Sequence, residues 1–161
     1  MANIRHLIEE NITGSDVLHL AGKLGAKYEQ EVYAVGGYVR DLFLGIDIKE
    51  IDFMVVGDGI KFARSLANEL KVNKIVPFHR FSTARIPYKK IPLEVASART
   101  ESYDDSSRKP NKIQYTDLKG DLLRRDFTIN AMAVDLHPKR FGDLSDPFKG
   151  ILDLQKKHLV T

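Results

Sequence analysis

Hydrophobic residues recur along this chain with two spacings, one typical of helices and one typical of strands. Near the N-terminus an apolar residue returns every three or four positions, which predicts helices over about 4–12 and 15–25. The same spacing predicts another helix over 62–70. Short apolar runs predict strands over 32–35, 51–56, 74–77, 81–86, 91–98 and 132–136.

Glycine and polar residues divide these elements. A helix over 38–44 is predicted between Gly36-Gly37 and Gly45, the latter at a left-handed position. The polar stretch 100–112 is predicted to be a mobile loop, and a partly helical basic stretch follows it. A final amphipathic segment is predicted from Asp146 onward.

Composition narrows the class of protein. The chain has 161 residues, 43% of them hydrophobic, which suffices for one domain with its own core. It contains no cysteine, which excludes disulfides, thiolate metal sites and a cysteine nucleophile. No apolar stretch approaches the roughly 18 residues of a membrane span, and the acidic N-terminal segment is unlike a signal peptide. We therefore expect a cytoplasmic protein with no membrane partner.

The charge distribution permits a nucleic-acid partner without requiring one. The net charge is only +3, with a pI near 9.0. Seven basic residues nevertheless gather between Arg99 and Arg125, next to the predicted loop.

The run from Val35 to Val56 carries the first candidate chemistry. Gly36 and Gly37 let the backbone approach an anion at the start of a helix, where backbone N–H groups point outward. Arg40, one turn later, can reach a phosphate or can pair with Asp41. The run matches neither the P-loop nor the dinucleotide-binding fingerprint.

Three acidic residues lie on predicted strands. Glu50 and Asp52 are two positions apart, so their side chains lie on one face of a strand and can share a hard cation such as Mg²⁺. Glu94 interrupts the apolar strand IPLEVASA. It is either a third carboxylate, serving as metal ligand or as base, or an edge-strand glutamate that faces water beside Pro92.

The segment RRDFTINAMA, from Arg124 to Ala133, is the second unusual cluster. Arg125 can contact a phosphate, Asp126 can cap the following turn, and Asn130 can bond a sugar or the backbone. The alternative is an ordinary capped helix with two exposed arginines.

These motifs together resemble a known family. GGYVRD at 36–41, E-x-D at 50–52, ARTE at 98–101, RRDFTINA at 124–131 and DPFKG at 146–150 occur in this order. In this combination the chain resembles the class II tRNA nucleotidyltransferases and bacterial poly(A) polymerases, members of the polymerase-beta-like nucleotidyltransferase superfamily. The match covers the chain from about residue 30 onward and is specific for the N-terminal catalytic head domain.

The resemblance implies a fold, a reaction and roles. It implies an α+β head with a mixed sheet of about five strands flanked by helices, and Mg²⁺-dependent transfer of a nucleoside monophosphate from ATP or CTP to an RNA 3′ hydroxyl, with tRNA CCA addition as the first expectation. Glu50 and Asp52 would bind the metal, with Glu94 as the third acidic residue. The candidate nucleotide-binding residues are Gly36, Gly37, Arg40, Arg99, Arg125, Asp126 and Asn130.

Two departures from the family pattern matter. The first metal-binding position is Glu50 where the family has aspartate, and the extra methylene moves the carboxylate oxygens. The family's helical neck, with its E-D-x-x-R motif for base selection, has no match here, nor has the body that grips tRNA. We therefore expect residues 1–161 to be a head domain that works with a neck and body in the same chain or in a partner. The alternatives are a poly(A)-adding enzyme or a catalytically weak nucleotide- or RNA-binding module.

Overall fold

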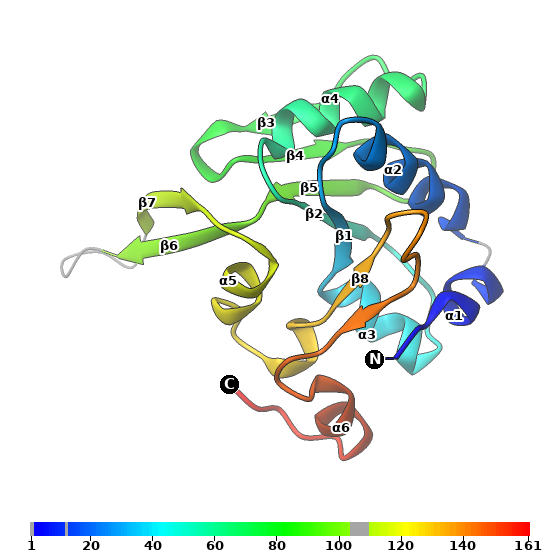
Figure 1. The fold of residues 1–161 in the computed structure, drawn as a ribbon, viewed down its shortest axis with the longest axis vertical. Coiled ribbons are helices and arrows are strands. Elements are labelled where there is room, and N and C mark those ends of the chain that lie inside the picture. Colours follow the sequence, from blue (N-terminus) through cyan, green and yellow to red (C-terminus); the bar gives the residue numbers. More distant parts are fainter. Residues whose placement is uncertain (1, 12, 104–109) are drawn as a thin grey trace.

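A seven-stranded mixed sheet forms the centre of the protein (Figure 1). The computed structural model describes residues 2–11, 13–103 and 110–161. The helices are α1 (Arg5–Glu10), α2 (Ser15–Lys27), α3 (Gly37–Leu44), α4 (Gly59–Glu69), α5 (Leu118–Leu123) and α6 (Gly150–Gln155). The sheet strands are β1 (Val32–Val35), β2 (Ile51–Val55), β3 (Val76–Phe78), β4 (Thr83–Ile86), β5 (Leu93–Ser97), β8 (Ala133–Asp135) and β9 (Leu144–Ser145). Short 3-10 turns, η1 (His79–Phe81) and η2 (Thr128–Asn130), and a hairpin of β6 (Arg99–Tyr103) and β7 (Pro110–Tyr115) complete the described elements.

The strand order is β3-β4-β5-β2-β1-β8-β9. The central neighbours β2 and β5 run parallel, and the other pairs run antiparallel. A parallel pair needs a long connection, and here α4, β3 and β4 supply it. The predicted mixed sheet is confirmed, with seven strands rather than about five because short strands extend both edges.

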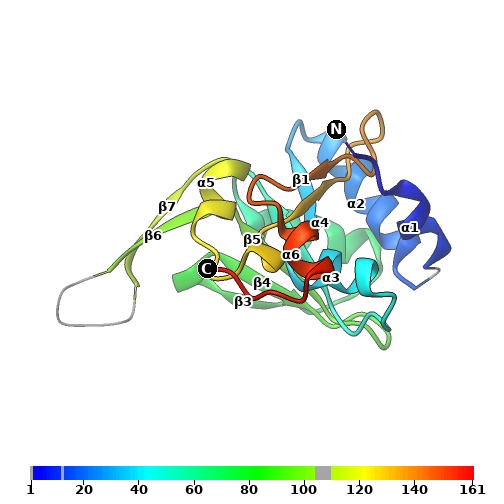
Figure 2. The same cartoon turned by 90° about the horizontal axis from the view of Figure 1, so that it is seen from below.

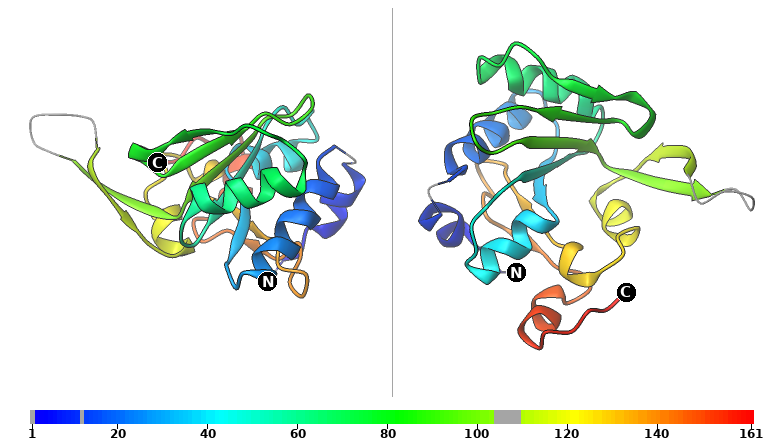
Figure 3. Two further views of the ribbon diagram at one scale, coloured as in Figure 1. Left: turned by 90° about the horizontal axis from the view of Figure 1, so that it is seen from above. Right: turned by 180° about the vertical axis from the view of Figure 1, so that it is seen from behind.

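One face of the sheet carries the main hydrophobic core. Helix α4 packs on β4 and β5, and α2 packs on β1 and α4, as Figure 3 shows from two sides. Ile51, Phe53 and Val95 point into this core and are at most 1% exposed. The alternation predicted for 51–56 is therefore confirmed. Among the described residues no helix is long and apolar enough to cross a membrane.

The opposite face is covered over only part of its width. A second apolar cluster lies there against α5 and consists of Tyr33, Val35, Met54, Ala98, Leu122 and Ala133. Toward the β3 edge, by contrast, Val76 and Phe78 are 49% and 48% exposed. This half-covered face is the one that carries the candidate site.

The structure corrects the sequence analysis between residues 99 and 115. The predicted loop over 100–112 is wrong for the parts that pair as β6 and β7. Figure 2 shows this hairpin projecting from the rest of the molecule. Most residues of the two strands are polar, and the alternation of Ile113 and Tyr115 is too short to predict a hairpin. Residues 104–109 of the predicted loop lie outside the described residues.

Candidate functional site

Three carboxylates meet on the half-covered face. Asp52 on β2 and Glu94 on β5 are direct partners in the parallel register, and Glu50 immediately precedes β2. One oxygen from each of the three lies within 4.8 Å of the others. The edge-strand interpretation of Glu94 is therefore wrong: β5 lies between β4 and β2, and Pro92 precedes the strand.

The environment of Asp52 shifts the pKa of its carboxyl group strongly. Burial raises its pKa to about 7, and the hydrogen bond with Glu50 and the negative charges of Glu50 and Glu94 act in the same direction. The positive charge of Arg125 opposes the shift. Such crowding of acidic groups favours binding of a proton or a cation.

Arg85 joins the carboxylates from the neighbouring strand. It is the register partner of Glu94 on β4, so it lies on the same face, and its Nη2 is 3.3 Å from Glu50 Oε2. The sequence analysis missed this residue. Its only signal in the sequence is that Arg85 is two residues after Thr83 in the predicted strand 81–86, so both side chains would point to the same face.

A second group of side chains presents Arg125 to the double glycine. The buried carboxylate of Asp121 accepts hydrogen bonds from Arg125 Nε at 3.2 Å and Nη2 at 3.0 Å. The remaining nitrogen, Nη1, lies against Gly36, where an added Cβ would come within 3.2 Å of it and 3.7 Å of Asp52 Oδ2. Gly36 also has φ of 66°, which favours glycine.

Arg40 has a matching arrangement at the second glycine. Its Nε donates to Asp41 Oδ1 at 3.0 Å and its Nη1 to Asn130 Oδ1 at 2.9 Å. Its Nη2 lies against Gly37, where an added Cβ would be 3.2 Å away. Both alternatives for Arg40 are thus compatible, because the pair with Asp41 leaves one end of the guanidinium beside the double glycine. Asn130 acts here as the acceptor that orients this arginine.

Asp121 connects further basic residues to the same place. Its Oδ2 accepts the Arg99 backbone N–H at 3.0 Å and Arg124 Nη2 at 3.4 Å. The Arg99 side chain donates to the Phe81 carbonyl and lies over the Phe81 ring, 5.7 Å from its centroid. The sequence analysis missed Asp121, although its spacing of three and four residues from the two arginines is that of ion pairs on one helix face.

A cavity of about 200 Å³ lies between the acidic and basic groups. Its lining includes Asp52, Glu94, Thr83, Arg99, Arg124 and Arg125. Asp126 is exposed, and the predicted cap at this residue is wrong, since Phe127 occupies the cap position of η2 and no side chain caps the turn. Arginine and carboxylate groups around one cavity suit a phosphate held beside a cation.

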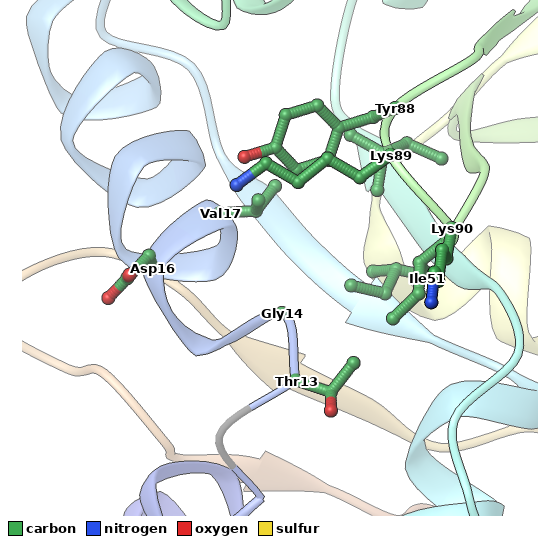
Figure 4. A pocket seen from close by; sticks show the side chains of 10 residues that line it. Thr13, Gly14, Asp16, Val17, Ile51, Tyr88, Lys89 and Lys90 are labelled. Atoms are coloured by element: carbon green, nitrogen blue, oxygen red, sulfur yellow. The ribbon is translucent and has the colours of Figure 1, made fainter.

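A larger cavity, of about 400 Å³, lies at the opposite face of the sheet (Figure 4). Val17 and Asp16 of α2 line it on one side and Tyr88 and Lys89 of the β4–β5 connection on the other. Ile51 also lines it, whereas its neighbour Asp52 lines the smaller cavity. The candidate site residues Asp52, Glu94, Arg99 and Arg125 all line the smaller cavity.

A mixed sheet with three carboxylates, faced by arginines and a double glycine, matches the resemblance to nucleotidyltransferase heads. The family model described as "Poly A polymerase head domain" matches residues 32–160. The chain belongs to this family, and the predicted resemblance is confirmed.

Curated relatives agree with the family assignment. The chain is 45% identical over 125 residues to an A-adding tRNA nucleotidyltransferase of Aquifex aeolicus, a match that covers 78% of the chain. It is 42% identical over 155 residues to an A-adding tRNA nucleotidyltransferase of Geobacter sulfurreducens, with 94% of the chain covered. The matches span only 15% and 17% of the length of these relatives.

Solved structures have the same fold. A CCA-adding enzyme in apo form II superposes with a TM-score of 0.85 at 37% identity, covering 98% of this chain and 38% of that one. The Thermotoga maritima CCA-adding enzyme complexed with tRNA has a TM-score of 0.81 at 35% identity, covering 98% and 35%. A complex of CCA-adding enzyme with CTP also has a TM-score of 0.81, at 37% identity, covering 98% and 36%.

Proposed function

We propose that this chain is the catalytic head of a nucleotidyltransferase that transfers a nucleoside monophosphate from ATP or CTP to the 3′ end of RNA, tRNA first of all. The observation that carries the proposal is the group of three carboxylate oxygens within 4.8 Å, facing arginines that are already oriented. The names of the relatives, A-adding and CCA-adding enzymes, support the same reaction class.

The donor set fits Mg²⁺. All three candidate ligands are carboxylate oxygens, the kind that Mg²⁺ prefers. Burial raises the pKa of Asp52 first of all, and the negative charges of Glu50 and Glu94, which a cation would relieve, raise it further. Glu50 and Asp52 would hold the metal, with Glu94 completing the group. A bound metal would neutralise the charge of the phosphates and would lower the pKa of a hydroxyl bound next to it.

The arginine side of the site suits the triphosphate. The guanidiniums of Arg125 and Arg40 each present one nitrogen beside Gly36-Gly37, where the N-terminus of α3 begins. Backbone N–H groups at a helix start and guanidinium donors both favour phosphate oxygens. Because Asp121, Asp41 and Asn130 fix both arginines beforehand, little side-chain entropy is lost on binding.

Glu94 lies beside Asp52 on the neighbouring parallel strand β5. It lines the cavity and is partly exposed, so it can accept the proton of the attacking 3′ hydroxyl or complete the metal site. In either role it acts on the acceptor side of the reaction.

The test is calorimetric titration of ATP and of CTP into the chain, with Mg²⁺ and with EDTA. Binding that requires both Mg²⁺ and Asp52, judged with Asp52→Ala, supports the proposal. Glu69→Ala, which removes an exposed carboxylate at the end of α4, is the matched control and should bind as the unsubstituted chain does. Absence of nucleotide binding in every condition would overturn the proposal for this chain.

We expect ATP and CTP to bind with equal affinity, because the sequence contains no E-D-x-x-R motif to read the base. Extension of a labelled RNA with each nucleotide measures whether transfer accompanies binding. A catalytically weak module would bind nucleotide but would add no nucleotide to the RNA.

A further inference from the structure

The segment between α4 and β5 has a charge unlike that of the rest of the chain. Residues 70–93 contain no aspartate or glutamate, although the whole chain has 22 acidic residues against 25 lysines and arginines. The basic residues of this segment are Lys71, Lys74, Arg80, Arg85, Lys89 and Lys90, all of them exposed. The segment therefore carries a charge of +6 in a protein of net charge +3.

Part of this segment belongs to the same face as the carboxylates. Val76 on β3 is the register partner of Arg85, Arg85 that of Glu94, and Glu94 that of Asp52. Register partners point to one face of a sheet, so these four side chains form one row across four strands. Phe78 lies on the same face of β3, two residues after Val76.

This end of the face presents an apolar surface beside charge. Phe78 and Val76 are about half exposed, at 48% and 49%. Arg80 lies two residues after Phe78, in η1, and its guanidinium lies over the Phe81 ring at 5.6 Å. An exposed aromatic ring among basic side chains is the combination that binds single-stranded nucleic acid, by base stacking and phosphate contact.

The sheet face differs on the two sides of the three carboxylates in how much room it leaves for a bound molecule. On the β1 side the second apolar cluster and the oriented arginines enclose the cavity. On the β3 side the row continues through Arg85 to the exposed edge. A polymeric acceptor has to extend beyond the reacting atoms, and among the described residues the β3–β4 side is where this face is exposed.

We propose that the β3–β4 edge, defined by Lys74, Val76, Phe78, Arg80 and Arg85, binds the single-stranded 3′ end of the acceptor RNA. Phe78 stacks on a base near the terminus, and Lys74, Arg80 and Arg85 contact the adjoining phosphates. Arg85 lies 3.3 Å from Glu50 in the protein alone and thus stands at the junction between the RNA and the carboxylates. This inference rests on the proposed function, because it assigns the acceptor of that reaction.

The experiment measures the affinity of the full chain for a fluorescein-labelled RNA hairpin with a single-stranded 3′ overhang, by anisotropy at several salt concentrations. Phe78→Ala should weaken binding about fivefold or more, as expected for loss of one stacking aromatic side chain. Lys74→Gln/Arg80→Gln should lower the slope of log affinity against log salt by about 1.4, since each single-strand phosphate contact contributes about 0.7.

Matched controls lie in α2 and at its C-cap residue, Tyr28, on the core face of the sheet. Tyr28 is as exposed as Phe78, at 50%, and Lys23 and Lys27 are exposed lysines of the same helix. Tyr28→Ala and Lys23→Gln/Lys27→Gln should leave RNA affinity and its salt slope unchanged. If the edge variants bind RNA as tightly as the unsubstituted chain, or lose no more than the α2 variants do, the proposal is overturned.

Nucleotide binding separates this inference from the function on which it rests. The edge variants should bind ATP with Mg²⁺ as the unsubstituted chain does, because none of the substituted residues lines the nucleotide cavity. Intact ATP binding with unchanged RNA affinity overturns only the RNA surface. If the unsubstituted chain does not bind ATP, the proposed function itself is overturned.

Discussion

At the scale of single residues, the site depends on side chains that hold other side chains. Arg125 and Arg40 each donate hydrogen bonds from two guanidinium nitrogens to acceptors within the protein, and the third nitrogen lies beside the double glycine. Glu50 likewise is bonded to Arg85 on one side and to Asp52 on the other. The orientation of each of these side chains therefore depends on the neighbouring side chain to which it is bonded.

Shortening Glu50 tests the first of these contacts. In Glu50→Asp the carboxylate loses the reach to Arg85 and is freed for the metal. The ion pair is largely exposed and worth at most about 1 kcal/mol, so we expect Mg²⁺ affinity to rise by no more than about fivefold. Calorimetric titration of Mg²⁺ measures this, and a lower affinity of Glu50→Asp would show that glutamate is the better residue here.

The sequence alone identified most of the residues that the structure brings together. Glu50, Asp52, Glu94, Gly36, Gly37, Arg40, Arg99 and Arg125 gather around or beside one cavity. Asp121 and Arg85 escaped notice because each looks like an ordinary exposed charge within a helix or strand. Their roles depend on tertiary neighbours, which sequence spacing indicates only weakly.

At the scale of elements, the short helix α5 carries much of the organisation of the site. Asp121 is fully buried on this helix, while Arg125, one turn on, is 18% exposed. A buried carboxylate with several donors both fixes the arginines and offsets their charge. The helix thus orders the basic wall of the cavity as one unit.

Substitution of Asp121 tests this role. Asp121→Asn leaves the arginines without their counter-charge, and we expect the free energy of unfolding to fall by about 3 kcal/mol. In the folded fraction the affinity for ATP should fall as Arg125 loses its orientation. Denaturant titration and calorimetry measure the two effects.

The control lies on the same helix. Asp117 caps α5 by accepting the Gly120 N–H, and asparagine caps equally well, so Asp117→Asn should change neither quantity. In an Arg125→Lys background, Asp121→Asn should weaken ATP binding less than it does in the unsubstituted chain, because only the contacts with Arg99 and Arg124 then remain to be lost. An equal loss in both backgrounds would mean that Asp121 does not act on nucleotide through Arg125.

The turn between β1 and α3 provides a second test at this scale. Gly36→Ala places a methyl group 3.2 Å from Arg125 Nη1 in a backbone conformation that favours glycine. We expect a loss of ATP affinity, because the guanidinium has to move. Gly45→Ala also occurs at positive φ, 65°, but meets nothing within 4 Å, so it should affect stability while leaving ATP affinity unchanged.

Elements without side-chain periodicity were the hardest to predict. Strand β9 has two residues, and the β6–β7 hairpin carries polar side chains where a loop was expected. The long amphipathic helices and the buried central strands were predicted well, since each has an apolar face that the fold buries. Helix α2 even extends two residues past the predicted glycine stop.

At the scale of the whole molecule, the sheet separates two tasks. One face builds the hydrophobic core, and the other concentrates three acidic groups in one place. The acidic group lowers the stability that the hydrophobic core provides, because crowded carboxylates in the metal-free protein destabilise the fold.

Stability should therefore depend on pH in a defined direction. The pKa of Asp52 is raised to about 7 in the folded protein from 3.8, so between about pH 4 and pH 7 the folded state binds more protons than the unfolded state. Its ionisation lowers the free energy of unfolding as pH rises through that window. In EDTA, Asp52→Asn should be more stable than the unsubstituted protein at pH 8, and this difference should shrink toward pH 4.

Denaturant titrations at several pH values measure this difference. Added Mg²⁺ should reverse its sign at pH 8, since the metal stabilises the ionised carboxylates. An equal difference between the two proteins at pH 5 and pH 8 in EDTA would contradict the raised pKa.

The parallel pairing of β2 with β5 has a consequence for when the proposed metal site forms. The carboxylates come from chain segments about forty residues apart, and α4, β3 and β4 lie between these segments in the sequence. Contacts of such long sequence separation form late in folding. A chain that has not completed its fold has no ligand group to offer, so the proposed Mg²⁺ would bind only the folded molecule and would shift the folding equilibrium toward it.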